Sequence, residues 1–401
     1  MSNKITRFAF KLGMDTMFDN TFNAFQSKSK KNLLKAYWLF QFMSWNKLTK
    51  IGTYFVKIAL KAPLGAKKII KSTLFQQFCG GESLAECEQT ISELNKYGLS
   101  AIPDYVAEGQ EDSKAFDNAT SQILRTITMA KQNPAVSFAV FKVTALGSFG
   151  MLEKKQRGEM LSSQELSDWE DLQRRFTLLV YSAAEAKVAV LVDAEETWIQ
   201  DVVDELVLDA MLQFNKEKAY VFTTCQMYRK DMLERLKKLA EKAKQDKFIL
   251  GVKLVRGAYL EKENERALRL AYPSPMFEEK VLTDKAFDEA LAFCLGQEIS
   301  LCIGTHNEAS VLKAIKLMNE KGIQSSSDKI CFAQLYGMSD HISFNLAKYG
   351  FRVAKYLPFG PMELSLPYLF RRANENKSVA GQVSRELSLI KKELERRAKK
   401  S

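Results

Sequence analysis

Eight short apolar stretches recur between residues 99 and 356, and they limit the possible folds more than any other feature of the sequence. Amphipathic segments with helical periodicity separate them. Strands that alternate with helices predict a parallel sheet with right-handed crossovers. The predicted strands are Leu99–Ile102, Val136–Val143, Val188–Val192, Ala219–Thr224, Phe248–Val255, Ile299–Ile303, Ile330–Leu335 and Phe351–Tyr356.

Eight such repeats favour closure into a TIM-like (βα)8 barrel of the α/β class, although an open doubly wound sheet alternates in the same way. We expect three regions. Residues 1–80 form a basic helical N-terminal extension, residues 81–384 form the barrel, and residues 385–401 form a basic C-terminal helical tail.

Polar side chains stand at or near the end of nearly every predicted strand. Asp193 follows the third strand, Gln226 follows the fourth, and Lys253 lies on the fifth. Thr305, His306 and Asn307 follow the sixth. Because barrel active sites lie at the carboxyl ends of the strands, these side chains predict an active site there.

The net charge of +11 lies at the two ends of the chain. Residues 1–71 carry 14 basic and two acidic side chains, and residues 385–401 carry seven basic and three acidic ones. The net charge of residues 72–384 is therefore about −5. A nucleic-acid-binding role is therefore not expected. We expect no secretory signal, no membrane span and six reduced core thiols. No histidine, cysteine or carboxylate grouping has metal-ligand spacing, and no G-x-G-x-x-G fingerprint appears.

Arg371 and Arg372 follow the last predicted strand, and Tyr368 and Glu375 share their broad helical face. Two adjacent guanidinium groups suit a carboxylate, which each can grip through two hydrogen bonds. An isolated Arg-Arg pair is usually a solvated basic patch. Its position after the eighth strand favours a substrate clamp, with Glu375 close enough to orient the pair.

Five motifs occur in an order that resembles the proline dehydrogenase family. They are Val192-Asp-Ala-Glu-Glu196, Gly251-Val-Lys-Leu-Val-Arg-Gly-Ala-Tyr259, Thr305-His-Asn307, Phe332-Ala-Gln-Leu-Tyr-Gly-Met338 and Tyr368-x-x-Arg-Arg-x-x-Glu-Asn376. The resemblance extends from about residue 78 to 379. It implies a distorted (βα)8 barrel that holds FAD and oxidises L-proline to Δ1-pyrroline-5-carboxylate, the first step of proline catabolism to glutamate.

The resemblance also implies a role for each matching residue. Arg371 and Arg372 would bind the proline carboxylate, and Glu375 would orient them. Lys142 and Asp193, on adjacent strands, would line the same pocket, and Glu108 would gate it. The pyrrolidine ring would contact Tyr356, Tyr368 and Leu335.

The flavin contacts implied in the same way follow the fourth, fifth and sixth strands. Gln226 and Lys253 would approach the isoalloxazine edge. A close approach of the cofactor would use Val255, Gly257 and Ala258, and its pyrophosphate and ribose would meet Thr305, His306 and Asn307. Many relatives carry arginine where this chain has Lys253, and some carry tryptophan where it has Leu260.

Proline dehydrogenases typically reduce a membrane quinone, so the resemblance implies such an acceptor. The basic, aromatic segment 1–71 suits the surface of an anionic membrane, and a solvated basic cap is the alternative. The expected location is the cytoplasm with peripheral attachment to the inner membrane, or the matrix side in a mitochondrion. A separate dehydrogenase would consume the pyrroline-5-carboxylate.

Two other functions remain open. A hydroxyproline dehydrogenase would use the same scaffold, but the bulk of Tyr356 argues against a ring hydroxyl. A non-catalytic barrel protein at the membrane surface would not need polar groups at its strand ends.

Overall fold

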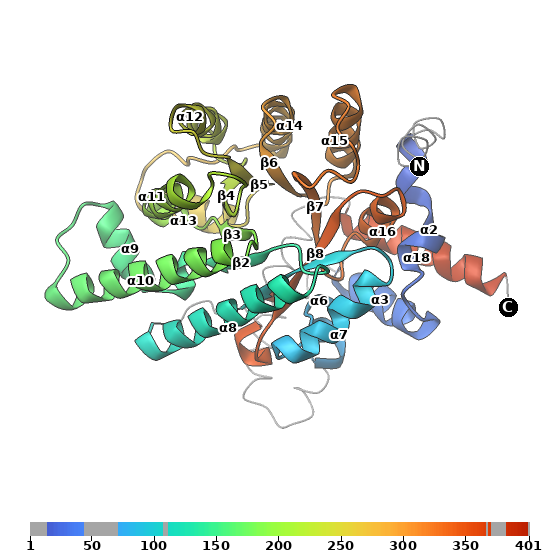
Figure 1. The fold of residues 1–401 in the computed structure, drawn as a ribbon. Coiled ribbons are helices and arrows are strands. Elements are labelled where there is room, and N and C mark those ends of the chain that lie inside the picture. Colours follow the sequence, from blue (N-terminus) through green and yellow to red (C-terminus); the bar gives the residue numbers. More distant parts are fainter. Residues whose placement is uncertain (1–13, 44–70, 107–110, 366–367, 370–381, 400–401) are drawn as a thin grey trace. The chain divides into compact units, whose positions relative to one another are not determined.

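Eight parallel strands follow one another in sequence order around a closed barrel (Figure 1). The computed structural model describes residues 14–43, 71–106, 111–365, 368–369 and 382–399. The strands are β1 (Ser100–Tyr105), β2 (Ala139–Lys142), β3 (Val190–Asp193), β4 (Val221–Gln226), β5 (Gly251–Val255), β6 (Ser300–Gly304), β7 (Ile330–Leu335) and β8 (Val353–Phe359). The predicted (βα)8 barrel is confirmed, and the open sheet is excluded.

Helices separate the strands as the periodicity predicted. Those between or after strands are α8 (Ser113–Gln132), α9 (Phe149–Gln156), α10 (Ser163–Glu185), α11 (Thr197–Phe214), α12 (Met232–Gln245), α13 (Leu260–Arg269), α14 (Lys280–Gly296), α15 (Glu308–Glu320), α16 (Asp340–Lys348) and α18 (Gln382–Ala398), with a short 3-10 turn η3 (Val143–Ala145). Before β1 lie η1 (Met14–Asp19), α2 (Thr21–Phe25), α3 (Lys30–Met43), η2 (Lys71–Phe75), α6 (Gln76–Phe78) and α7 (Leu84–Asn95).

Seven of the eight strands have limits that differ from the predicted ones, and β1 and β8 extend furthest past their predicted ends. β8 continues to Phe359, so Tyr356 lies inside the strand and not at its end. β1 includes Asp104 and Tyr105, which lie past the predicted strand end at Ile102. Both extensions arise from pairing between these two strands, where Asp104 lies opposite Pro358 and Tyr105 opposite Phe359.

The chain forms two compact units. The first unit contains residues 1–106 and 334–401, and the second contains residues 107–333. In the second unit, Figure 1 shows α11, α12 and α14 outside the strands β3–β6. The expected division at residues 80 and 384 stays a prediction.

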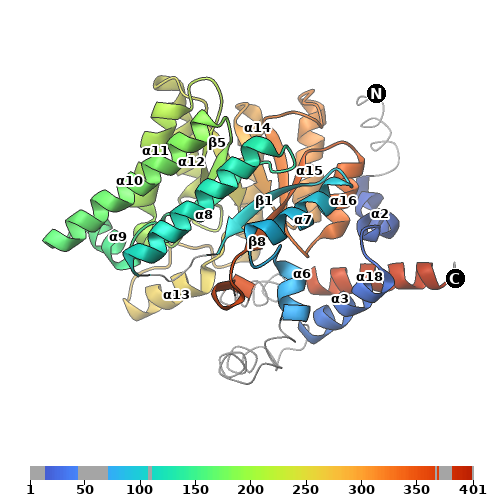
Figure 2. The ribbon, with the colours of Figure 1, turned by 60° about the horizontal axis from the view of Figure 1, so that its bottom comes forward.

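The first unit brings the helices from both ends of the chain together. α3 and α18 lie side by side (Figure 2) and share one apolar cluster that includes Leu33, Phe40, Leu389 and Ile390. Arg397 on α18 donates to the main-chain oxygen of Phe25 at 2.8 Å. The helix expected as a basic tail is therefore buried along one side in this unit.

A buried ionic cluster lies at the start of α16 in the same unit. Asp340 is 2.8 Å from the Nζ of Lys355 and 2.9 Å from that of Lys28. Lys355 also donates to the main-chain oxygen of Met338 at 2.6 Å. Burial would raise the pKa of Asp340, but the two ammonium groups together hold it well below its usual range.

The six cysteines are all buried. Burial raises the pKa of the Cys87 thiol and that of the Cys294 thiol to about 12 each. Among the residues that the structure describes, no group of three or more histidine, cysteine or acidic side chains could hold a metal ion. In the same residues, no helix combines the length and apolarity needed to cross a bilayer.

Candidate functional site

The strand ends of the second unit hold a buried ion pair. The Nζ of Lys253 on β5 lies 2.5 Å from Oδ1 of Asp193 at the end of β3. β4 lies between these strands, so both side chains project to the inside of the barrel, where alternate strands contribute to one layer. The structure thus joins a predicted flavin contact to a predicted substrate contact.

Lys142 lies beside this pair. It ends β2, and its Cα is the register partner of Asp193 on β3. The prediction that Lys142 and Asp193 lie on adjacent strands is confirmed. Three predicted residues, Lys142, Asp193 and Lys253, therefore come from β2, β3 and β5 to the same end of the barrel.

Glu195 follows β3 and connects the neighbouring strand ends. Its carboxylate accepts hydrogen bonds from Thr144, from the main-chain N–H at 3.1 Å and from the hydroxyl at 2.5 Å. Its main-chain oxygen accepts a bond from the buried amide of Gln226 on β4, at 2.8 Å. The Gln226 amide oxygen accepts from the N–H of Ala258 at 3.4 Å.

The turn after β5 is fixed by glycine geometry. Gly257 has φ +129°, and a Cβ there would lie only 2.4 Å from the ring of Tyr228. Val255 ends the strand, and Leu260 begins α13 with 42% of its surface exposed. The glycine at 257 is therefore required by the packing of Tyr228 as well as by its backbone angle.

Arg256 organises the predicted pyrophosphate region. Its guanidinium donates to Asp284 at 2.6 Å, to the hydroxyl of Thr305 at 2.8 Å and to Ser310 at 2.9 Å. Asn307 caps α15 by accepting from the N–H of Ser310 at 3.2 Å, and half-buried His306 precedes it. Thr305, His306 and Asn307 thus stand at a helix N-terminus, a setting that favours anions.

The remaining described candidates belong to the first unit. Tyr356 is buried within β8, and its main-chain oxygen accepts from the N–H of Tyr336 at 2.9 Å. Tyr368 is a buried member of the apolar cluster shared by α3 and α18, and Leu335 packs against that cluster. Arg371, Arg372, Glu375 and Glu108 lie outside the described residues.

Two residues in the second unit have contacts that the sequence did not reveal. Arg256 and Glu195 occur in two of the family motifs, but the sequence assigned no role to either residue. Their partners, Thr305 and Thr144, are 49 and 51 residues away in the chain. Only the register of the strands brings such pairs together.

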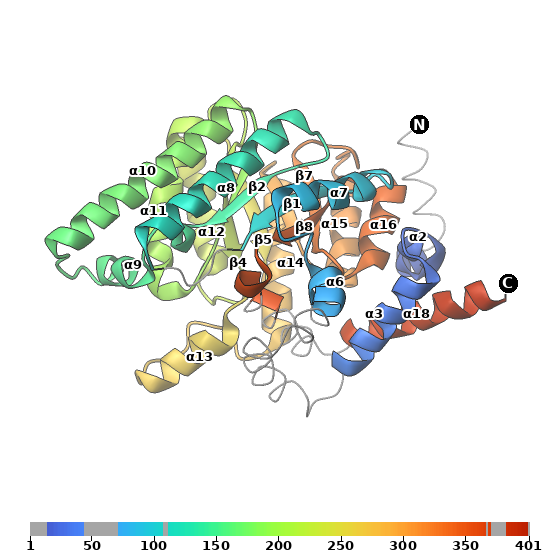
Figure 3. The same ribbon diagram turned by 90° about the horizontal axis from the view of Figure 1, so that it is seen from below.

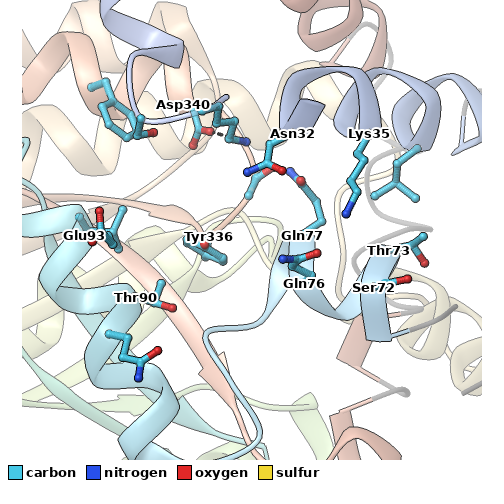
Figure 4. Close-up of a pocket in the computed structure, with 17 residues that line it drawn as sticks. Asn32, Lys35, Ser72, Thr73, Gln76, Gln77, Thr90, Glu93, Tyr336 and Asp340 are labelled. Atoms are coloured by element: carbon cyan, nitrogen blue, oxygen red, sulfur yellow. Dashed lines mark hydrogen bonds and ion pairs between the residues drawn. The ribbon is translucent and has the colours of Figure 1, made fainter. Parts of the chain in front are cut away.

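The first unit also contains a cavity of about 470 Å³ (Figure 4). Most of its lining residues are polar and come mainly from α3, η2, α6, α7 and the segment from the end of β7 into α16, with Asn32, Gln77, Thr90, Tyr336 and Asp340 among the side chains. None of the predicted site residues within the described part of the chain lines this cavity, although Tyr336 directly follows Leu335.

A model of the family described as proline dehydrogenase matches residues 87–385. The chain belongs to the proline dehydrogenase family. It is therefore an oxidoreductase of a family whose members are flavoenzymes.

The most similar sequences include proteins with different names. The carbapenem antibiotics biosynthesis protein CarD of Pectobacterium carotovorum is 36% identical over 351 residues, covering 87% of this chain and 90% of that protein. Proline dehydrogenase 1, mitochondrial, of Dictyostelium discoideum is 33% identical over 96% of this chain and 75% of its own length. A Xenopus laevis hydroxyproline dehydrogenase is 28% identical over 93% of this chain and 88% of its own length.

Solved structures support the same fold. Proline utilization A (PutA) from Bdellovibrio bacteriovorus matches 95% of this chain with a TM-score of 0.78 at 19% identity. This chain spans 42% of the length of that PutA chain. This structural similarity therefore supports the barrel fold of this chain. It does not extend to the activities of the longer PutA protein.

Proposed function

We propose that this protein oxidises L-proline to Δ1-pyrroline-5-carboxylate. When bound, FAD would supply the acceptor for the hydride that leaves the ring CH2 next to nitrogen. The ring nitrogen would lose a proton as the C=N bond forms, and the electrons would pass on to a membrane quinone. The contact that carries this proposal is the 2.5 Å ion pair between Lys253 and Asp193. It brings the residue expected at the flavin within hydrogen-bonding distance of a residue expected at the substrate.

The residues present fit a flavin. Lys253 supplies a buried cation, a group that favours negative charge on a nearby cofactor. Gln226 and Ala258 join the ends of β4 and β5, and Gly257 permits the tight turn after β5. Arg256 holds Thr305 at the start of α15, where a pyrophosphate would meet N–H groups.

Charged side chains would hold one side of the substrate, and aromatic and apolar side chains would contact its ring. Arg371 and Arg372, oriented by Glu375, would clamp the carboxylate, and Lys142 and Asp193 would line the polar side. Tyr356, Tyr368 and Leu335 would contact the ring, and Glu108 would gate the pocket. Orientation of the ring relative to the acceptor would be the main contribution of the protein.

Anaerobic titration of the purified holoprotein with L-proline tests this proposal. We expect a yellow protein whose flavin absorbance bleaches with proline. Trans-4-hydroxy-L-proline is the comparison ligand, because a Xenopus laevis relative is named hydroxyproline dehydrogenase. Preferential bleaching by hydroxyproline would replace the proposed substrate, and bleaching by neither would favour the non-catalytic alternative.

The arginine clamp is tested separately. Arg372→Met should raise the apparent KM for proline by about tenfold or more while FAD stays bound, since a charged hydrogen bond to a carboxylate contributes about 1.5–3 kcal/mol. An unchanged KM would remove the clamp assignment.

Peripheral attachment to an anionic membrane through residues 1–71 is part of the proposal. Trp38 and Phe42 on α3 are 65% and 51% exposed, beside Lys35. Leu33 and Phe40 of the same helix are buried, so deletion of the segment would damage the core. Trp38→Ser should weaken co-sedimentation with phosphatidylserine vesicles, and Leu268→Ser, at an 85% exposed position on α13, should not. Equal binding by both variants would exclude this surface.

A further inference from the structure

Glu195 is a buried carboxylate with connections to four strand ends. It is 4% exposed and lies two residues after Asp193. Through Thr144 it reaches the turn after β2, and through its own backbone it belongs to the end of β3. Its main-chain oxygen binds Gln226 of β4, which in turn accepts from Ala258 after β5.

The segment around Glu195 also bonds to helix α11. Its N–H donates to the amide oxygen of Gln200 on α11 at 2.7 Å, and Gln200 donates to Asp204 at 2.8 Å. Main-chain N–H, main-chain oxygen and carboxylate of this one residue therefore all have protein partners. A shift of Glu195 would move residues that belong to the proposed substrate and flavin contacts.

Opposing effects set the pKa of the Glu195 carboxyl. Burial raises its pKa to about 7, while the Lys142 charge and the bonds from Thr144 act in the opposite direction and the Glu196 charge adds to the rise. The charged groups that face it are thus Lys142 from β2 and Glu196 from its own segment, with Asp204 reached through Gln200. Its ionisation changes the field at Lys142.

We propose that Glu195 is a positioning residue of this site. Its carboxylate holds the end of β2, and with it Lys142, against the ends of β3 and β4, where Asp193 and Gln226 lie. Ionised Glu195 attracts the ammonium group of Lys142, and this attraction is lost when Glu195 takes up a proton. This inference rests on the proposed oxidation of proline.

Glu263 provides a matched control in the same unit. It is fully buried on α13 and accepts two bonds from one threonine, the N–H and the hydroxyl of Thr197, each at 2.7 Å. The bonding pattern is the same as that between Glu195 and Thr144. The difference is that α13 carries none of the proposed substrate contacts.

The experiment compares Glu195→Gln with Glu263→Gln in the holoprotein. Each variant loses one acceptor oxygen and one charge, so both should lower the melting temperature by similar amounts. At pH 8, Glu195→Gln should lower kcat/KM for proline about tenfold to a hundredfold, as does the replacement of a residue that orients a metal ligand in a metalloenzyme. Glu263→Gln should leave kcat/KM within about twofold of the parent.

The pH dependence separates positioning from a purely structural role. The ratio of parent to Glu195→Gln kcat/KM should fall toward one between pH 8 and pH 6, because the parent glutamate takes up a proton near its pKa of about 7. Groups common to both proteins cancel in this ratio. Glu195→Asp, which keeps the charge, should recover part of the loss at pH 8.

A second measurement does not depend on turnover. FAD titrated into the apoprotein should bind several-fold more weakly to Glu195→Gln than to Glu263→Gln, because Gln226 loses its fixed partner segment. Parallel pH profiles and equal FAD affinities for the two variants would overturn the positioning role. Failure of proline to bleach the parent flavin would instead reject the proposed function, and the FAD comparison would still decide the role of Glu195.

Discussion

Two buried lysine–aspartate clusters, one in each unit, show how the same chemistry differs with its surroundings. In the first unit, Asp340 meets two ammonium groups, those of Lys28 and Lys355. In the second unit, Asp193 meets Lys253 across β4. The exposed fractions of the side chains are 1% for Lys355 and 7% for Asp340, against 9% for Lys253 and 12% for Asp193.

The difference indicates separate roles. Lys355 also donates to a main-chain oxygen, and its cluster fixes α16 to β8 and to the segment before α3. This cluster holds packed elements together, and Lys28 and Asp340 also line the cavity of the first unit. The Asp193–Lys253 pair stands at strand ends, next to Lys142, where a barrel binds its substrates.

The largest expected effect comes from breaking the first cluster. Asp340→Ala should lower the free energy of unfolding by about 3–5 kcal/mol, because the buried charge of Lys355 loses its partner. Urea denaturation at pH 7 measures this change. A loss below about 1 kcal/mol would mean that the cluster contributes little to stability, and the contrast between the two units would fail.

Breaking the second cluster should act mainly on activity. Asp193→Asn keeps the shape of the side chain but removes its charge, and should lower kcat/KM for proline about a hundredfold, about 2.7 kcal/mol in the transition state. Its unfolding free energy should fall less than that of Asp340→Ala. A stable variant with parental kcat/KM would show that Asp193 has no part in substrate oxidation.

Acid should weaken the first cluster in a defined range. The pKa of Asp340 is lowered in the folded protein, so its contribution to stability is present above the unfolded-state pKa of about 3.9 and is lost as the pH falls toward the folded value. The stability gap between the parent and Asp340→Asn should therefore narrow below pH 4, by about 1.4 kcal/mol per pH unit. Urea curves at several pH values would measure it, and a constant gap would contradict the assignment.

The smallest effect concerns Lys355. In Lys355→Met, Asp340 keeps Lys28 as its partner, and the new side chain is apolar and similar in length. Because Lys28 still neutralises Asp340, no buried charge is left without a partner, so we expect a loss of about 1 kcal/mol or less in unfolding free energy. A loss equal to that of Asp340→Ala would show that Lys28 does not neutralise Asp340.

The strand pattern could be predicted because each strand is short, apolar and bounded by helical periodicity. The predicted limits of β7 match those observed, and the other seven strands were found with ends displaced by a few residues. β1 and β8 extend furthest past their predicted carboxyl ends, because these two strands lie far apart in the sequence and pair with each other. Pairing of this kind adds hydrogen bonds that no local pattern records.

The candidate site was predictable only in part. Lys142, Asp193, Gln226 and Lys253 were found from their positions at strand ends and from the family motifs. Three contacts were not predicted. They are the ion pair between Lys253 and Asp193, the hydrogen bond from Thr144 to Glu195 and the hydrogen bond from Arg256 to Thr305. Each joins residues 49 to 60 positions apart, from strands or turns that only the barrel makes neighbours.

The sequence by itself determined the alternation of strands and helices, the chemistry at the strand ends and the family. Periodicity and motifs are local properties, so they can be read from neighbouring residues. The tertiary structure alone decided which charges neutralise one another and that helices from both ends of the chain share one apolar cluster. These outcomes depend on distances between remote segments, and those distances are set by barrel closure and core packing.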